Sequence, residues 1–404
     1  MKVVHVTTID AGGAYKAALR LHQGLMKKGI TSQILLRTKL NSANEGAEVF
    51  GNPLSSCLSK AKNLFNLCMA DGEIARDVLG TDISGNKMVR EADVIILHWI
   101  NSFLTPKEIR KLAALHKPII WILHDMWLFT GGCHTDGYCG GYESGCSTCV
   151  ISPKGISGKN FREKEKLLAE IDATIVGPSR WITDCAKKSR ILSAKSIHFI
   201  PNMLDTQVYH PIQDKQALYQ KYGVDQGKWI ILFGAADSGT ENENKGFQYL
   251  LKALESLPRD KFQLVVFGNT GKNMKLPEGF AVTFLGFIRD DESLVEVYNM
   301  ADVFVNPSNQ ESFGYTACEA LACGTPVVCF PVGGLKDQVE HMKNGYIAAY
   351  HDAEDLAKGI VHCAEQTWKL GKNAVAMAQR YSDDVVTEAY AKLIKDIENC
   401  GSVG

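Results

Sequence analysis

The chain has 404 residues, of which 45% are hydrophobic and 22% charged, and its formal net charge at pH 7 is −1. This length leaves room for two or three domains, and the composition excludes disordered and collagen-like classes. A net charge near zero offers no general attraction for a polyanion, so we expect no nucleic-acid partner.

No stretch of the sequence has the pattern of a targeting or membrane-spanning segment. Residues 1–9 are too short and too polar for a signal peptide, and the apolar runs at 93–100 and 117–125 are far shorter than the roughly 20 residues of a membrane span. The sequence therefore predicts a cytoplasmic protein without an integral anchor. The segment 58–69 is the best candidate for an amphipathic helix, which would allow peripheral contact with a membrane.

The first half of the chain alternates strand and helix patterns. An apolar, β-branched run at 3–8 is followed by Gly12 and Gly13, then by a helix pattern at 15–28 and a second strand at 32–37. This order requires the two strands to pair in parallel. Further strands are predicted at 93–97, 118–123 and 174–177, and further helices at 163–170 and 178–189 with Ser179 as the N-cap. Residues 128–162 form a long irregular insertion, and such insertions are usually functional.

A second alternating series occupies the other half of the chain. Its strands are predicted at 196–200, 229–234, 262–267, 281–285, 303–306 and 325–330, and its helices at 246–256, 291–299 and 316–322. The whole pattern predicts an α/β protein with two Rossmann-like, doubly wound parallel-sheet domains. We expect an N-terminal domain at 1–180, a C-terminal domain at 181–381, and a final helix at 382–404 that packs back on the first domain.

Several chemically active residues of the first half follow predicted strands, where open parallel sheets bind their ligands. Gly12 and Gly13 open a helix whose amides and positive dipole end suit an anion, although a simple tight turn is an equal alternative. A lone histidine is usually structural, but the shared place of His98 and His124 at this edge favours a functional role for His124, whereas the structural interpretation stays ahead for His98. Asp125 would either orient His124 or cap the next segment.

Lys245 stands directly before an amphipathic helix of the second half. A lysine at a helix start opposes the helix dipole, and a phosphate bound nearby would reverse that cost. A solvated loop lysine is the alternative interpretation.

Two acids, Glu311 and Glu319, lie on either side of the predicted start of the helix at 316–322. The amides of 314–316 can hold a diphosphate, and the two carboxylates can accept hydrogen bonds from hydroxyl groups at both ends of the ligand. A nucleotide sugar has this arrangement of groups. A capped helix with two exposed acids is the alternative.

Four cysteines lie in one glycine-rich segment that ends in C-x-x-C, namely Cys133, Cys139, Cys146 and Cys149. This spacing suits a structural zinc site, in which His134 would replace one of the thiolates. Disulfides and free thiols are the other two interpretations. A metal ion would order a loop that lacks a core of its own, and no catalytic metal is expected.

The chain resembles the retaining glycosyltransferases of the GT-B fold, in the large bacterial family 4 that includes sucrose synthases and mannosyltransferases of cell-surface polysaccharides. The resemblance extends over nearly the whole chain, through 11-AGGA-14, 124-HD-125, 200-IPNMLD-205, 245-KG-246, 285-LGF-287, 306-NPSNQESFGYTACEALACGTPVV-328, 332-VGGLKDQV-339 and 344-NGYIA-348. The block 306–348 is its most specific part. The segment after His124, with its trailing cysteines, is most similar to capsule and exopolysaccharide transferases.

This resemblance implies a retaining hexosyl transfer from a UDP- or GDP-sugar to a saccharide or lipid-linked saccharide. The two domains would face each other across a cleft, with the acceptor on the N-terminal side and the nucleotide sugar on the C-terminal side. Retention in this family is ascribed to front-side attack, which needs neither a protein nucleophile nor a catalytic metal. Stabilisation of the departing diphosphate would then carry much of the catalysis.

The resemblance also assigns roles to individual residues. Glu319 would bind the ribose of the donor, Glu311 its sugar, and Lys245 its diphosphate. His124 would lie near the same sugar. The further residues implied at the donor are the amides of Phe313, Gly314, Tyr315 and Thr316 for the diphosphate, Gly12 and Gly13 near the phosphates and the acceptor, and Gly234 and Gly286 in the base pocket.

Two departures from the family pattern leave other functions open. The family commonly pairs its phosphate-binding lysine with an arginine a few residues earlier, but 237–244 contains none, and 202-NM-203 stands where Asn-Gly is usual. The missing arginine favours an inactive sugar-binding paralogue. A nucleotide-sugar epimerase of the same fold is the other alternative, against which the block 306–348 argues. A dehydrogenase is disfavoured because no good G-x-G-x-x-G is present.

Overall fold

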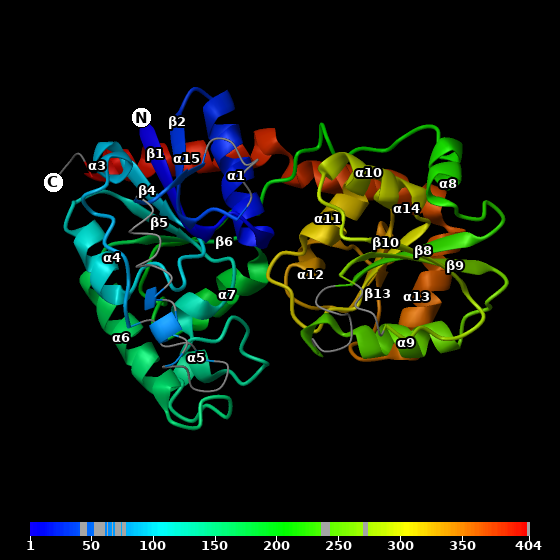
Figure 1. Cartoon of the computed structure of the whole chain (residues 1–404), viewed down its shortest axis with the longest axis horizontal. Coiled ribbons are helices and arrows are strands. Elements are labelled where there is room, and N and C mark those ends of the chain that lie inside the picture. Colours follow the sequence, from blue (N-terminus) through cyan, green and yellow to red (C-terminus); the bar gives the residue numbers. More distant parts are fainter. Residues whose placement is uncertain are drawn as a thin grey trace. The chain divides into compact units, whose positions relative to one another are not determined.

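The structure is a computed structural model that describes residues 1–40, 47–51, 61–62, 64–66, 68, 74, 78–235, 243–269 and 274–401 (Figure 1). Residue contacts divide the chain into two compact units. Unit 1 comprises Met1–Met203 with Asp383–Gly404, and unit 2 comprises Leu204–Ser382. Each unit has its own parallel sheet, which confirms the predicted fold class of two parallel α/β halves.

The sheet of unit 1 has seven strands in the order β3-β2-β1-β4-β5-β6-β7, all paired in parallel. The strands are β1 (Lys2–Ile9), β2 (Thr31–Thr38), β3 (Ala47–Val49), β4 (Val94–Leu97), β5 (Ile119–Ile122), β6 (Thr174–Gly177) and β7 (Ile197–Phe199). The sequence assigns residues 196–200 to the second half, and that prediction is wrong. Strand β7 pairs with β6 because α7 (Arg180–Lys188) is a crossover helix that returns the chain to the same sheet.

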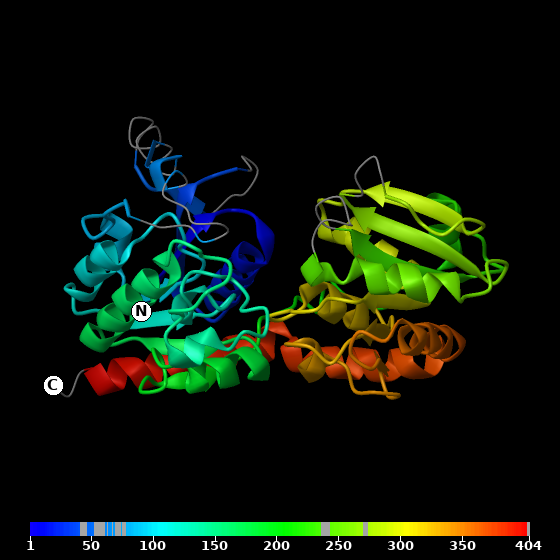
Figure 2. The ribbon, with the colours of Figure 1, turned by 90° about the horizontal axis from the view of Figure 1, so that it is seen from below.

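Helices cover both faces of this sheet. Successive residues of a strand point to opposite faces, so neighbouring residues of β1 belong to different cores. Val3 joins one core with α1 (Gly12–Lys27) and α15 (Asp383–Gly401). Val4 joins the other core with α7 and with α3 (Lys87–Glu91), α4 (Pro106–Ala113) and α6 (Ile156–Glu170). Figure 2 shows α15, at the red end of the colour scale, running along unit 1, so this helix completes unit 1 although unit 2 precedes it in the sequence.

Two helix starts in unit 1 follow from local chemistry. The Ser179 hydroxyl accepts a hydrogen bond from the amide of Ile182 at 3.3 Å, which confirms the predicted N-cap of α7. Helix α4 was not predicted, yet Thr105 and Glu108 form a capping box around Pro106, its first residue.

Unit 2 has a six-stranded parallel sheet in the order β10-β9-β8-β11-β12-β13. Its strands are β8 (Trp229–Ala235), β9 (Phe262–Gly268), β10 (Ala281–Gly286), β11 (Val303–Asn306), β12 (Val327–Cys329) and β13 (Gly345–Ile347). Its helices are α8 (Gln216–Tyr222), η2 (Glu243–Lys245), α9 (Phe247–Glu255), α10 (Asp291–Met300), α11 (Tyr315–Ala322), α12 (Leu335–Gln338), α13 (Ala353–Glu365), α14 (Thr367–Ala378) and η3 (Gln379–Tyr381). The central strands are continuous apolar runs, because helices cover both of their faces.

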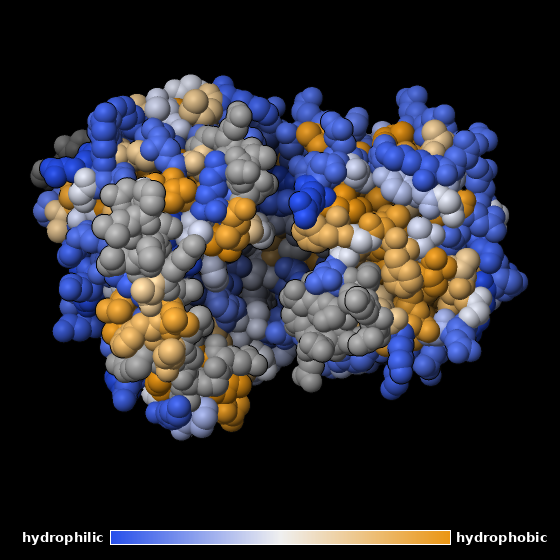
Figure 3. Space-filling view, viewed as in Figure 1, coloured by the Kyte–Doolittle hydropathy of each residue, from blue (hydrophilic) through white to orange (hydrophobic). Residues whose placement is uncertain are grey.

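The surface of the described chain adds two observations. No helix in the described ranges combines the length and the apolar character needed to cross a membrane. Within the expected amphipathic segment 58–69, only 61–62, 64–66 and 68 are described, so that prediction lies largely outside the described residues. Figure 3 shows hydrophobic side chains gathered on unit 2 over β10, where Phe284 and Phe287 are 50% and 71% exposed.

Adjacent valines on α15 allow the contribution of this helix to unit 1 to be measured. Val386 is 1% exposed and Val385 is 54% exposed. We expect Val386→Ala to lower the free energy of unfolding by about 2 kcal/mol, because two buried methyl groups are lost. The same change at Val385 should cost less than about 0.5 kcal/mol. Urea unfolding of both variants measures the difference, and equal effects would contradict the packing of α15 on unit 1.

Candidate active site

Two charged residues meet at the carboxyl edge of the sheet in unit 2. Strands β8 and β11 are parallel neighbours, so the loops that follow them lie side by side. The amide of Asn309 donates to the carbonyl of Asn244 at 2.8 Å and ties the two loops together. Beside this contact, Lys245 Nζ lies 3.2 Å from Glu311 Oε2, with the side chains 45% and 22% exposed. Such an accessible ion pair adds little stability, about 0–1 kcal/mol, and leaves both groups available to a ligand.

The loop that carries Glu311 is held by the segment 332–339. The amide of Gly334 donates to the carbonyl of Glu311 at 2.9 Å, and Gln338 Nε2 donates to the carbonyl of Phe313 at 2.7 Å. A Cβ at Gly333 would lie 1.7 Å from the carbonyl oxygen of Glu311, so only glycine allows this approach. These contacts fix the backbone between Glu311 and the start of α11.

Helix α11 begins without a side-chain cap. Gly314 is its N-cap, with φ of 91° in the left-handed region, and a Cβ there would lie 2.7 Å from Leu335. Tyr315 and Thr316, which follow it, are only partly buried. The positive end of the helix dipole therefore lies close in sequence to Glu311, at a place suited to an anion.

Glu319 has a different environment from Glu311. Its side chain lies in the second turn of α11 and is 2% exposed, and Tyr298 donates a hydrogen bond to Glu319 Oε2 at 3.1 Å. Burial and the neighbouring Glu319 carboxylate hold the pKa of Tyr298 well above its ordinary value, so the phenol remains a donor. The structure thus pairs Glu311 with Lys245 but places Glu319 in the interior. Tyr298 is a partner that the sequence did not reveal.

The two glycines expected at the base pocket lie on the same side of the sheet. Gly234 is the penultimate residue of β8, and Gly286 ends β10 with φ of 67°. Leu285 and Phe287, the neighbours of Gly286, line a hollow of about 460 Å³ together with Tyr222. The hollow is also lined by Lys221, Arg289 and Asp290, so its wall combines an aromatic surface that suits a flat ring with charged groups.

In unit 1, Gly12 and Gly13 are exposed at the start of α1. Ala11 is the N-cap and offers no side-chain oxygen, and Gly12 has φ of 78° with open space where a Cβ would stand. The expected turn between strand and helix is therefore present.

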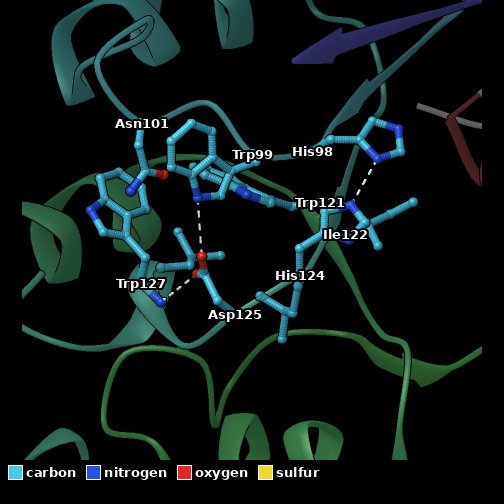
Figure 4. Close-up of a pocket in the computed structure, with 10 residues that line it drawn as sticks. His98, Trp99, Asn101, Trp121, Ile122, His124, Asp125 and Trp127 are labelled. Atoms are coloured by element: carbon cyan, nitrogen blue, oxygen red, sulfur yellow. Dashed lines mark hydrogen bonds between the residues drawn. The ribbon is translucent and has the colours of Figure 1, made fainter. Parts of the chain in front are cut away.

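Three histidines of unit 1 form a hydrogen-bonded chain. His98 Nδ1 lies 2.9 Å from His124 Nε2, a contact drawn in Figure 4, and His98 Nε2 lies 2.9 Å from His5 Nδ1. The two rings predicted at the strand ends are thus in contact, because β4 and β5 are parallel neighbours. His5 was missed, although a histidine inside the buried run 3–8 was a usable signal.

All three rings are neutral at pH 7. Burial lowers the pKa of His5 to about 3 and that of His124 to about 4, and it holds the pKa of His98 well below its ordinary value. The neighbouring rings add to this effect at His98, whereas Asp125 opposes it at His124.

Asp125 organises the segment that follows β5. Its Oδ2 accepts a hydrogen bond from Trp99 Nε1 at 3.1 Å, and its Oδ1 accepts one from the amide of Trp127 at 2.8 Å (Figure 4). Its Oδ2 also accepts from His134 Nδ1 at 2.6 Å. Asp125 thus binds the first amide of the 3-10 helix Trp127–Phe129, whose N-cap is Met126, and its charge also acts on His124. Asp125, Trp99 and Trp127 line a cavity of about 10 Å³, the size of one water molecule, together with the His98–His124 pair.

The zinc site expected at the four cysteines stays a prediction. All four thiols lie in the described chain, where no group of three or more His, Cys, Asp or Glu side chains is arranged to hold a metal ion. The thiols are near neighbours, since Cys139 Sγ and Cys146 Sγ would each lie 3.5 Å from a Cβ at Gly141, but they differ in exposure. Cys146 is buried in the apolar core, which raises its pKa to about 11, whereas Cys139 is exposed and Cys133 and Cys149 are partly buried.

Comparison with known proteins matches residues 214–381 to the family described as "Glycosyl transferases group 1". A D-inositol 3-phosphate glycosyltransferase of Corynebacterium jeikeium is 34% identical over 314 residues, which are 70% of this chain and 71% of that protein. Another, of Xylanimonas cellulosilytica, is 29% identical over 57% of this chain, which spans only 60% of that relative's length. The putative colanic acid biosynthesis glycosyl transferase WcaC of Escherichia coli is 25% identical over 78% of this chain and 80% of its own.

Solved structures share the fold over the whole chain. Sucrose-phosphate synthase (tll1590) from Thermosynechococcus elongatus has a TM-score of 0.72 at 19% identity, covering 99% of this chain and 100% of its own. Anabaena Alr3699/HepE in complex with UDP-glucose has a TM-score of 0.66 at 20% identity, covering 98% and 100%.

The histidine chain predicts a pH dependence of stability. A folded-state pKa below the unfolded value means that the unfolded chain binds a proton that the folded chain does not, so stability is present above pH 6.5 and is lost as the pH falls. Between pH 7 and pH 5, the buried neutral state of His98 alone should lower the free energy of unfolding by about 2 kcal/mol. His98→Phe should remove that part of the pH dependence, whereas His210→Gln, at an exposed position, should not. Chemical unfolding at both pH values measures it, and identical slopes in wild type and His98→Phe would contradict the buried neutral state.

Proposed function

Because the chain belongs to the group 1 glycosyltransferases, we propose that it transfers a hexosyl group from a nucleoside diphosphate sugar to a hydroxyl of a saccharide or lipid-linked saccharide, with retention of configuration. The observation that carries this proposal is the Lys245–Glu311 pair beside the uncapped start of α11. A cation and a helix N-terminus suit a diphosphate, and a carboxylate suits the hydroxyl groups of a sugar.

The roles of the residues follow from their environments. Lys245 and the amides of 314–316 would hold the diphosphate, and Glu311, released from Lys245, would accept hydrogen bonds from the sugar. Glu319 would accept from the ribose, and its bond to Tyr298 keeps the buried carboxylate oriented until then. The glycines at 333 and 334 matter because they prevent this loop from relaxing away from α11.

The proposed reaction proceeds by front-side attack. The bond between the anomeric carbon and the diphosphate oxygen breaks, and a bond from that carbon to the acceptor oxygen forms on the same face. The proton of the acceptor hydroxyl passes to the departing diphosphate. The charge that grows on this diphosphate faces Lys245 and the dipole of α11, and such preorganised stabilisation is commonly the largest catalytic contribution.

The finer identity of the substrates is also a proposal. We favour a uridine or guanosine donor and an acceptor of a surface polysaccharide. The similarity to WcaC, which its description places in colanic acid biosynthesis, supports the acceptor class. The UDP-glucose bound to the Anabaena relative supports a uridine donor. A thermal-shift panel of nucleoside diphosphates and their sugars identifies the base, because a ligand that binds only the folded state raises its melting temperature.

Two other functions are distinguishable by simple incubations. A nucleotide-sugar epimerase would convert the donor in the absence of any acceptor. A sugar-binding paralogue would bind the donor without turnover, and the lack of an arginine in 237–244 is the observation that favours it. Residues 237–242 of that segment lie outside the described chain.

Substitution of the ion pair tests the proposal. Lys245→Ala should lower kcat/KM about a hundredfold, because one positive group at the leaving diphosphate is lost. Glu311→Ala should have a similar effect on sugar transfer while it leaves the thermal shift caused by the nucleoside diphosphate largely intact. Lys252→Ala, an exposed position on α9, and Glu255→Ala, at the end of the same helix, are the matched controls and should keep wild-type rates.

The variants must first be shown to be folded by their melting temperatures. If Lys245→Ala and Glu311→Ala then turn over the donor at the wild-type rate, the assignment of this site is wrong.

A further inference from the structure

The chain His5–His98–His124 runs from the interior of unit 1 to the end of β5. Both N···N distances are 2.9 Å, and the ring centroids are 5.2 Å apart in each pair. His5 and His98 are 0% and 2% exposed, whereas His124 is only partly buried. One end of the chain is therefore enclosed by protein and the other is accessible.

Counting protons leaves two arrangements for this chain. A neutral imidazole has one N–H and one bare nitrogen, so a ring that donates on one side must accept on the other. In the inward arrangement, His124 donates to His98 and His98 donates to His5. In the outward arrangement, His5 donates to His98 and His98 donates to His124. The three tautomers therefore change together or not at all.

The enclosed end decides between the two arrangements. His5 Nε2 is buried, and none of the described residues gives it a hydrogen-bond partner. The inward arrangement would leave an N–H on that nitrogen, and the outward one leaves only a lone pair. Buried N–H groups without an acceptor are rarer in proteins than acceptors without a donor. The outward arrangement is thus the more stable one.

We propose that His5 and His98 are positioning residues that hold His124 with its proton on Nδ1, so that it presents a hydrogen-bond donor, and not a base, to the substrates. The tautomer of His124 follows from the hydrogen bonds among the three histidines alone. The use of this tautomer in sugar transfer rests on the proposed function. A hydrogen-bond donor at this place can hold an oxygen of the transferred sugar or stabilise an oxygen that gains negative charge. It cannot take the proton of the acceptor, and that proton is left to the departing diphosphate.

The low pKa values of the rings support the same arrangement. An extra proton would place a positive charge in the buried chain, and burial disfavours it at all three rings. The chain therefore stays neutral at pH 7, and His124 keeps a fixed polarity over the range in which an isolated histidine would titrate.

Nitrogen NMR of the protein without nucleotide sugar or acceptor saccharide tests the tautomer of His124 directly. In ¹⁵N-labelled protein at pH 7, the two ring nitrogens of a neutral histidine have well-separated shifts that reveal which one carries the proton. The signals of His124 are identified by their loss in His124→Asn. We expect the proton on Nδ1. A proton on Nε2, or a charged ring, in the wild-type protein would overturn the proposal.

Variants of His98 show whether the chain causes this tautomer. His98→Phe keeps an aromatic ring but removes both hydrogen bonds, so His124 should become a mixture of tautomers. His98→Asn should retain the Nδ1–H form, because its amide nitrogen lies close to the position of Nδ1 and can donate to His124. His362→Phe is the control. Nε2 of His362 is also buried without a hydrogen-bond partner among the described residues, but His362 belongs to unit 2 and is not one of the three hydrogen-bonded histidines. An unchanged His124 spectrum in His98→Phe would overturn the proposal.

Kinetics then connect the tautomer to the reaction. His98→Phe should lower kcat about tenfold, the effect of one lost hydrogen bond, with little change in KM for the donor, and His98→Asn should recover most of the rate. If the protein proves not to transfer sugar, the NMR result on the tautomer still stands. Failure of the proposed function and failure of this inference are therefore distinguishable.

Discussion

The candidate site in unit 2 depends on a backbone clamp. The carbonyls of Glu311 and Phe313 are bound by Gly334 and Gln338, so the short loop between them has its oxygens turned toward the protein. A loop fixed in this way can present an ionised side chain and a helix start at constant separation. Ligand binding then does not have to order the loop, and the ordering entropy does not reduce affinity. The cost of the clamp lies in two positions that accept only glycine, Gly333 and Gly314.

The two units differ in the burial and charge of their candidate functional side chains. Unit 2 keeps Lys245 and Glu311 accessible and charged, while Glu319 is buried beside a phenol. Unit 1 buries neutral imidazoles in series and leaves one end accessible. Charge is suited to a diphosphate, whereas a neutral donor of fixed direction is suited to hydroxyl and ring oxygens.

Much of this arrangement could be predicted from the sequence. Apolar runs in unit 2 and five strands of unit 1, namely β1, β2, β4, β5 and β6, have strong local patterns, and Ser179 has the chemistry of an N-cap. The short strand β3 has no such pattern and was not predicted. Strand β7 was misplaced because three residues cannot show which sheet they join. The burial of Glu319, the contact of His5 with His98, and the different exposures of the four thiols all arise from tertiary packing. Spacing along the chain predicts that such residues share an edge, but not which of them touch.

The order of segments in the chain has a consequence for biosynthesis. Unit 2 is one continuous segment, so its core can close as soon as residues 204–382 have left the ribosome. Unit 1 must wait, because the helix that covers the Val3 face of its sheet is translated after the whole of unit 2. Until then that apolar face is exposed in the nascent chain, where it can attract chaperones or misassociate. The half of the protein that is made first is therefore the half that is finished last.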